Sequence, residues 1–378
     1  MSKILLNAEE DAVITIWDAT YIYIEKSSSY DFQRKTYSGH KFRSLVKFMI
    51  CCSTDGYMIE FVGPYLCNGN NNDANITQDI FEKNYDDISQ FFYRNDVFVV
   101  DRGFRDSLNY LDSKGFKYQM PSFLKDKKQH SSIEANQSRI VTKIRWVIES
   151  VNSRIKKWKY FSNVLINKNI EFIEKDFRNI CALINKYRPQ IATTEDDDKF
   201  EDYRKMLKIS EKENTFLAEM AKYSNRIKKN AKCVDSIIIN FPKLTEEYIC
   251  SLTFGIYQLK QAKSYTAEHI DENGNYLFQM FYADDDETVI HVKLGSRFSK
   301  SVIHKTRIKY DCNLKLIEGQ NPITQWCCDC KAGARVFGMC AQVASILWFL
   351  GIARHEDKLM LPRKCDLFKD IVKTCLEI

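Results

Sequence analysis

The feature that most constrains the fold is a short, unbroken apolar run, Val97-Phe-Val-Val100, which is followed directly by Asp101. A strand without polar residues on either face must be buried on both sides, and such strands belong to sheets covered by helices. Arg102-Gly103 ends the run, and a short helix is expected to follow through Leu111. The run therefore predicts an α/β fold rather than a sheet with one face in water.

The segments around this run predict the rest of the sheet. Residues 13–24 are β-branched and aromatic and predict one or two strands, and residues 41–52 and 57–62 predict a hairpin around Thr54-Asp55-Gly56, with Gly63-Pro64 ending its second strand. Further elements are expected as a helix over about 76–93, a strand over 116–120 and helices over about 131–160 and 170–187. This order is typical of a mixed sheet flanked by helices.

The chain of 378 residues is long enough for two or three domains. We expect a first domain over residues 1–190, a charged helical connector over 191–240 and a smaller α+β region over 241–378. Alternation at 276–282 and 288–294 predicts paired strands in the last region, and residues 343–350 predict an apolar helix.

Composition excludes some functions. No apolar run approaches the roughly 18 residues of a membrane span, and the start of the chain lacks the apolar stretch of a secretory signal. We therefore expect a location inside the cell, with the 13 cysteines reduced or bound to metal. The net charge of +6 permits a nucleic-acid partner without requiring one.

Three acidic residues in different settings suggest a reaction. Asp18 interrupts an apolar, β-prone segment, Asp101 follows the buried strand, and Glu149 lies in the long predicted helix. Strand-end carboxylates joined by a helical one supply the hard oxygen ligands that a pair of magnesium ions needs for phosphoryl transfer. The alternative for Asp101 is a helix cap, and the alternative for Asp18 is a turn residue.

Glu149 has the most ordinary alternative. Helical phase places it nearly opposite the apolar stripe of its helix, so a solvated glutamate paired with Arg145 or Lys156 is the default interpretation. Between Arg139 and Lys159, however, the helix carries seven basic residues against this one acid, including Arg145, Lys156 and Lys157. Such a helix suits a phosphate backbone, although a solvated charged face is the competing explanation.

The stretch from about residue 14 to 189 resembles the catalytic domain of DDE-type transposases, in the Harbinger-like DDE superfamily endonuclease group. The matching segments are Trp-Asp18-Ala-Thr-Tyr-Ile-Tyr-Ile, Tyr37-Ser-Gly-His-Lys41, Asp55-Gly-Tyr, Gly63-Pro-Tyr, Asp101-Arg-Gly-Phe-Arg-Asp106 and Glu134-Ala-Asn-Gln-Ser-Arg-Ile-Val-Thr-Lys-Ile-Arg-Trp-Val-Ile-Glu149.

The resemblance implies an RNase H-like fold, two Mg²⁺ or Mn²⁺ ions, DNA as the partner, the nucleus as the location, and strand cleavage by water followed by strand transfer. Asp18, Asp101 and Glu149 fall on the family's catalytic triad. By the same resemblance Arg145 contacts phosphate or braces a carboxylate, and Lys41 lies near the DNA backbone.

The chain departs from the family in one respect, because members carry a DNA-binding region before the first catalytic Asp and only 17 residues precede Asp18. A truncated chain, a decayed copy of a transposable element and a domesticated relative are the three explanations. The main alternative to an enzyme is accordingly a catalytically inactive, domesticated transposase that binds DNA or protein.

Cys328-Asp-Cys330, followed after nine residues by Cys340-Ala-Gln342, resembles the SWIM-type zinc finger, whose pattern is Cys-x-Cys, a spacer and Cys-x-His. The resemblance implies a zinc module that binds DNA or protein partners. Gln342 stands where the family has its fourth ligand, histidine, and structural zinc sites normally take four ligands. Cys327, His355 or water is expected to take that place, and three reduced cysteines packed at a helix start are the alternative.

Overall fold

The computed structural model describes residues 1–192, 200–223, 239–270, 276–283, 286–299, 301–314 and 320–356. Its contacts divide the chain into two compact units. Among the described residues, unit 1 comprises Met1–Phe123 and Ile140–Leu207, and unit 2 comprises Leu124–Arg139 and the residues from Lys208 to Glu356. The boundaries expected from the sequence, at residues 190 and 240, remain a prediction.

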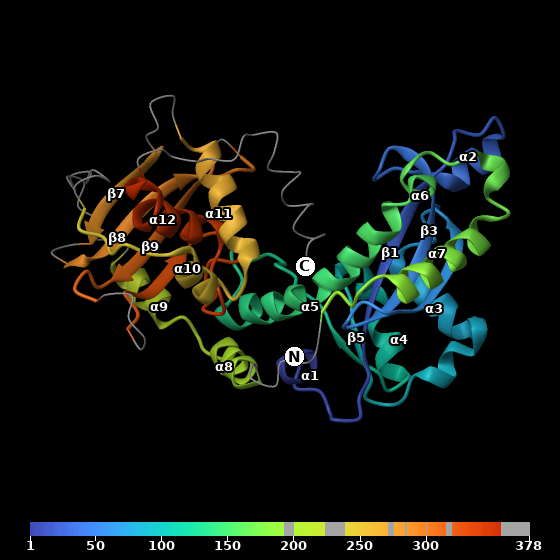
Figure 1. Cartoon of the computed structure of the whole chain (residues 1–378), viewed down its shortest axis with the longest axis horizontal. Helices are drawn as coiled ribbons and strands as arrows, with labels where there is room; N and C mark the ends of the chain where they lie inside the picture. Colours follow the sequence, from blue (N-terminus) through green and yellow to red (C-terminus); the bar gives the residue numbers. More distant parts are fainter. Residues whose placement is uncertain are drawn as a thin grey trace. The chain divides into compact units, whose positions relative to one another are not determined.

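Unit 1 is built on a mixed sheet with strand order β2-β3-β1-β5-β6, and β4 pairs with β3 (Figure 1). Strand β1 pairs antiparallel with β3 and parallel with β5, which in turn pairs parallel with β6. The strands are β1 (Ile14–Tyr23), β2 (Tyr37–Ser38), β3 (Arg43–Ser53), β4 (Met58–Leu66), β5 (Val97–Val99) and β6 (Lys117–Gln119). This mixed sheet with flanking helices is compatible with an RNase H-like domain.

The helices of unit 1 pack on the sheet because its apolar side chains alternate between two faces. Trp17 lies on one face with Phe81 and Phe98, and Phe48 stacks on Phe177 in a separate group of aromatic rings. The helical elements are α1 (Ser2–Leu5), α2 (Tyr30–Thr36), α3 (Asp73–Lys83), η1 (Tyr85–Phe91), η2 (Arg102–Ser107), α4 (Leu108–Ser113), α5 (Ser132–Lys156), α6 (Lys159–Ser162), η3 (Asn167–Asn169), α7 (Ile173–Tyr187) and α8 (Phe200–Ser210). By contacts, α5 begins in unit 2 and belongs to unit 1 from Ile140 onward.

Two expectations for unit 1 are wrong. The helix expected over 76–93 ends at Lys83, because Asn84 adopts the left-handed conformation that closes a helix, and a 3₁₀ segment follows. The strand expected to stop before Gly63-Pro64 continues to Leu66. Proline lacks an N–H donor but is tolerated in this strand because, among the described strands, β4 pairs with β3 alone.

Unit 2 contains an antiparallel sheet of order β10-β9-β8-β7. The pairing of β7 (Phe278–Ala283) with β8 (Asp286–Gly295) confirms the strand pair predicted there. Strands β9 (Ile303–Tyr310) and β10 (Ile323–Cys328) complete the sheet, and the remaining elements are α9 (Thr215–Tyr223), α10 (Glu246–Thr253), α11 (Ile256–Glu268), α12 (Ala341–Gly351) and η5 (Ala353–His355). The predicted apolar helix is α12, which is buried from Val343 through Gly351. No described helix has the length and apolar character that a membrane crossing requires.

Candidate metal centres and their surroundings

Strand register brings the first two acids of the predicted triad to neighbouring strands. The parallel pairing of β1 and β5 ends at Ile16 opposite Val99. Asp18 lies two residues beyond Ile16 and Asp101 lies two residues beyond Val99, so both follow the same end of this ladder. The carboxyl ends of parallel strands are where ligands bind in open α/β sheets.

Helix α5 contacts Asp18 through two side chains on one helical face. The Arg145 guanidinium lies 3.4 Å from one oxygen of the Asp18 carboxylate, and the Asn152 amide donates a hydrogen bond of 3.0 Å to the other. Glu149 lies four residues after Arg145 and three before Asn152, which places it on the same face of the helix. The stripe Arg145-Glu149-Asn152 is therefore directed toward Asp18.

The electrostatic environment of Asp18 reflects the other acids. Burial raises the pKa of Asp18 to about 7, the positive charge of Arg145 opposes this shift, and the charges of Asp101, Asp73 and Glu149 add to it. The charges of these three acids raise the pKa of Asp18 because all four carboxyl groups lie in one region of unit 1. A divalent cation among them would relieve this repulsion.

Asp101 is fixed by the helix cap that the sequence offered as the alternative to function. One oxygen of its carboxylate accepts a hydrogen bond of 2.7 Å from the Gly103 N–H at the start of η2. A Cβ atom on residue 103 would lie 2.9 Å from this oxygen and 3.0 Å from an oxygen of Asp73. A side chain at residue 103 would thus displace the two carboxylates from this turn, and the cap leaves the second oxygen of Asp101 available.

Glu149 is exposed, as its helical phase predicts, and forms no hydrogen bond or ion pair with the part of the chain that the structure describes. The expected pairing with Arg145 or Lys156 is wrong for the described residues, because Glu149 forms neither ion pair and Arg145 pairs with Asp18 instead. Among the described residues, the acids also do not form a group of three ligand atoms within 4.8 Å of one another. The carboxylates of the described residues therefore face one region without forming a compact group of three.

Sequence reasoning missed Asp73, the first residue of α3. Its carboxylate forms a largely buried ion pair of 3.2 Å with Lys47 on β3, and the Lys47 ammonium also donates to the Asn71 carbonyl. The polar run 68–73 predicted a loop, but nothing in it showed that the loop returns to the sheet beside Asp101. A basic residue inside the apolar strand, Lys47, was the available signal.

The basic residues predicted to bind DNA lie in different settings. Lys41 lies 5.3 Å above the ring of Tyr21, and it lowers the pKa of Lys156, although burial of Lys156 contributes more. Asp18 opposes that shift, so Lys156 and Lys41 lie within electrostatic reach of each other and of the acids. Arg145 is held by Asp18, and Lys157 is exposed just after the end of α5.

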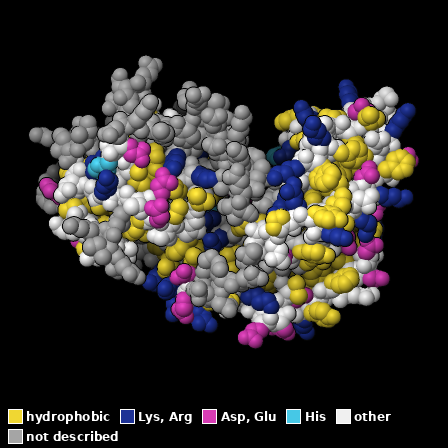
Figure 2. All heavy atoms as spheres, in the orientation of Figure 1, with side chains coloured by type: hydrophobic (Ala, Val, Ile, Leu, Met, Phe, Trp, Pro, Cys, Tyr) yellow, Lys and Arg dark blue, Asp and Glu magenta, His cyan; other side chains and the backbone are white. Residues whose placement is uncertain are grey.

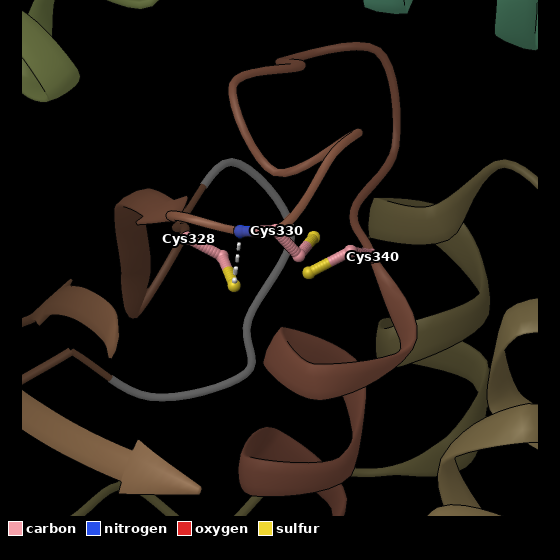
Figure 3. A group of neighbouring side chains, drawn as sticks. All are labelled: Cys328, Cys330 and Cys340. Carbon is pink, nitrogen blue, oxygen red and sulfur yellow. Dashed lines mark hydrogen bonds between the residues drawn. The ribbon is translucent and has the colours of Figure 1, made fainter. Parts of the chain in front are cut away.

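The second candidate centre lies in unit 2 and consists of the three predicted cysteines. Cys328 ends β10, Cys330 lies in the following turn and Cys340 precedes α12. Their sulfur atoms all lie within 4.8 Å of one another, and Figure 3 shows the side chains of Cys330 and Cys340 pointing toward each other. Cys328 and Cys330 donate to Cys340, which lowers the pKa of the Cys340 thiol, and the buried Arg335 guanidinium acts in the same direction.

Neither protein group proposed as the fourth ligand joins the three cysteines in the described structure. Cys327 packs with Phe216 and Val289 instead, because successive residues of β10 point to opposite faces. His355 accepts from the neighbouring Arg354. Gln342, at the position of the family's histidine, hydrogen-bonds the Tyr265 hydroxyl.

The loop between the cysteines is held by the segment that precedes α5. The Gln129 amide donates to the carbonyls of Cys328 and Cys330 at 2.6 and 2.8 Å, and the His130 N–H donates to the Lys331 carbonyl. Asn136 accepts from two further backbone N–H groups of the loop, those of Val336 and Phe337. Residues 124–139 therefore form part of the cysteine centre, which the linear sequence did not indicate.

Comparison with known proteins supports one of the two resemblances. Residues 17–185 match the family model described as DDE superfamily endonuclease, a segment that contains Asp18, Asp101 and Glu149. No curated protein and no solved structure shows a significant match to the chain. The match thus indicates a transposase-like nuclease domain, and the SWIM resemblance is supported by the cysteine cluster alone.

Proposed function

We propose that unit 1 is a divalent-metal-dependent DNA endonuclease and strand-transfer domain of the transposase type. The observation that carries the proposal is the direction of the Arg145-Glu149-Asn152 stripe. Two members of the stripe contact Asp18, and Asp18 and Asp101 both lie just beyond the same end of the parallel β1–β5 pairing. The third acid of the triad is thereby directed toward the other two, as a shared metal site needs.

The donor set fits Mg²⁺ or Mn²⁺. Both ions prefer hard oxygen ligands, and a two-ion site stabilises the attacking and leaving oxygens of an in-line displacement at phosphorus. Asp18, Asp101 and Glu149 would hold the ions. The pKa of Asp18 is raised first by burial and then by the charges of Asp101, Asp73 and Glu149, and a cation would offset this second contribution. Asp73, through its position beside Gly103, is a further oxygen donor in the same region.

The chain's own residues would position these ligands. Arg145 and Asn152 each bind one oxygen of Asp18 and so fix its orientation, and the Gly103 N–H fixes one oxygen of Asp101. None of the described residues restrains Glu149 in this way, so its carboxylate can adjust when cation and substrate are bound. Lys41, Lys156 and Lys157 would contact the phosphates of the DNA on either side of the cut.

The cysteines of unit 2 would bind Zn²⁺. Three thiolates within 4.8 Å of one another match the first three ligands of a structural zinc site, with Gln342 or water completing the shell. We propose that this SWIM-like module binds DNA or protein partners, in the nucleus. A second function, that of a catalytically inactive binding protein, is favoured by the spacing of the acids, which do not form a compact group of described ligand atoms.

The proposal is tested by nicking of supercoiled DNA in the presence and absence of Mg²⁺. Wild-type protein should nick only with Mg²⁺, and Asp101→Asn should lose at least about a hundredfold in rate, the scale of losing one directly stabilising group. Asp106→Asn is the matched control, since Asp106 is exposed on the same 3₁₀ segment and pairs with Arg105. Equal rates for wild type and Asp101→Asn, or no Mg²⁺-dependent nicking, would contradict the endonuclease proposal. The catalytically inactive binding protein would then be the remaining function.

A further inference from the structure

Phe42 is the most conspicuous aromatic residue that the proposed reaction does not use. It ends the four-residue turn between β2 and β3, and 77% of its surface is exposed. Its φ angle is +54°, in the left-handed region, which a bulky side chain adopts only at a cost. Backbone outliers of this kind occur preferentially at ligand-binding positions, so the turn is a place to look for a ligand.

Two cations flank this residue, and each lies over an aromatic ring of β1. Lys41 lies 5.3 Å from the centre of the Tyr21 ring, and Arg43 lies 5.3 Å from the centre of the Tyr23 ring. All five residues of the segment 39–43 are exposed. The turn therefore presents an aromatic side chain between two positive charges, a combination that suits a base between two phosphates.

The basic and aromatic residues continue from the turn to the carboxylates. The Tyr21 hydroxyl lies within electrostatic reach of Asp73, Asp18 and Asp101, which together with burial raise the pKa of Tyr21. Lys47, the partner of Asp73, also lies over the Tyr21 ring. On the face drawn in Figure 2, Lys and Arg side chains project around the end of unit 1 that carries α2 and α6.

The length of this path can be derived from the strand register. Tyr23 lies five residues after Asp18 on β1 and pairs with Leu45, and Phe42 lies three residues before Leu45. At about 3.3 Å per residue, these eight residues place Phe42 roughly 25 Å along the sheet from Asp18. A DNA strand that keeps the duplex advance of about 3.4 Å per nucleotide along the helix axis covers this distance in some seven or eight nucleotides.

We propose that Phe42 stacks on an unpaired base of the DNA strand that runs from the carboxylates past Tyr21, about seven or eight nucleotides from the phosphate that is cut. Lys41 and Arg43 bind the phosphates on either side of that base. This inference rests on the proposed function for its position, but the stacking contact itself requires no cleavage. A protein partner is disfavoured because the apolar surface of Phe42 is flanked by cations.

The test uses fluorescence anisotropy to measure how tightly the protein binds a twenty-nucleotide thymidine single strand and a blunt duplex of the same length. The buffer contains neither Mg²⁺ nor a chelator. Phe42→Ala should weaken single-strand binding about tenfold, within the usual range for one base–aromatic stack. Duplex binding should change less than twofold, and the salt dependence should be unchanged because no charge is removed. Phe42→Trp should retain wild-type affinity.

Phe91→Ala is the matched control, because Phe91 is 61% exposed in the same unit and lies in η1. Phe42→Gly removes the aromatic ring and also the backbone strain, so the variant should lose affinity for the single strand while its melting temperature stays unchanged or rises. This combination excludes misfolding as the cause of the lost affinity. Unchanged single-strand affinity of Phe42→Ala, or an equal loss for single strand and duplex, would overturn the stacking contact. Because binding is measured without Mg²⁺, a failure of nicking leaves this result interpretable.

Discussion

The two candidate metal centres differ in how far the chain assembles them by itself. The three thiols of unit 2 lie within 4.8 Å of one another and share hydrogen bonds. The carboxylates of unit 1 face one region but do not form such a group among the described residues. Two of the thiols donate hydrogen bonds to the third and so can pack around it in a protein interior, whereas carboxylates repel one another until a cation or a proton neutralises them. The thiol centre is therefore preformed, whereas the stability and activity of the carboxylate centre should depend strongly on its ion.

The largest effect should follow removal of a thiol. Cys340→Ser should abolish stoichiometric zinc binding and lower the stability of unit 2 by several kcal/mol, because metal-binding energy is folding energy in such modules. Zinc content by atomic emission and thermal unfolding provide the measurements. Cys312→Ser is the control, since Cys312 is exposed and lies outside the cysteine group. Full zinc content in Cys340→Ser would show that the three thiols are only packed together.

The pH dependence of stability should distinguish the carboxylate centre. Because the pKa of Asp18 is raised to about 7 in the folded protein, the unfolded chain loses this proton first as pH rises. The metal-free protein should therefore lose stability between about pH 4 and 7, by an amount on the order of 4 kcal/mol.

Asp18→Asn should remove this loss, because asparagine stays neutral and can still contact Arg145 and Asn152. Mg²⁺ at pH 8 should stabilise the wild type and not the variant. Urea titrations at several pH values, with and without Mg²⁺, measure both effects. Identical pH profiles for the two proteins would contradict the electrostatic account of this site.

Glu149→Gln tests whether the unrestrained member of the triad belongs to the site. We expect a loss of about a hundredfold in Mg²⁺-dependent nicking, with unchanged melting temperature of the metal-free protein, because Glu149 is exposed and forms no ion pair with described residues. Glu171→Gln, a change at another exposed glutamate of unit 1, is the control. If both variants nick at the wild-type rate, Glu149 is a solvated side chain.

The smallest effect should come from restoring the fourth zinc ligand. Gln342→His should tighten zinc binding by about tenfold or more, since a fourth protein ligand completes the tetrahedral shell. The change also removes the hydrogen bond from Gln342 to Tyr265, which reduces the net gain. Competition with a chromogenic chelator measures the affinity. An unchanged or weaker affinity would show that residue 342 cannot turn from Tyr265 toward the cysteines.

Prediction from the sequence succeeded where local pattern controls structure. The buried run before Asp101 predicted β5, and the turn at Thr54-Asp55-Gly56 predicted the β3–β4 hairpin. Helical phase also predicted that Glu149 is exposed. Helical phase could not show which strand lies opposite the face of α5 that carries Glu149, because that depends on how α5 packs on the sheet. The contacts of Arg145 and Asn152 with Asp18 supply this information.

The sequence by itself determined the order of the elements, the residues of the proposed triad and the cysteine spacing, because each depends on neighbours within a few residues or on a recognisable motif. Only the tertiary structure decided that Asp73 joins the acids, that Cys327 turns away from the other cysteines and that Gln129 and Asn136 hold the cysteine loop. These features arise from contacts between segments far apart in the chain. Sequence periodicity fixes the face on which a side chain lies, whereas packing between elements decides what that face meets.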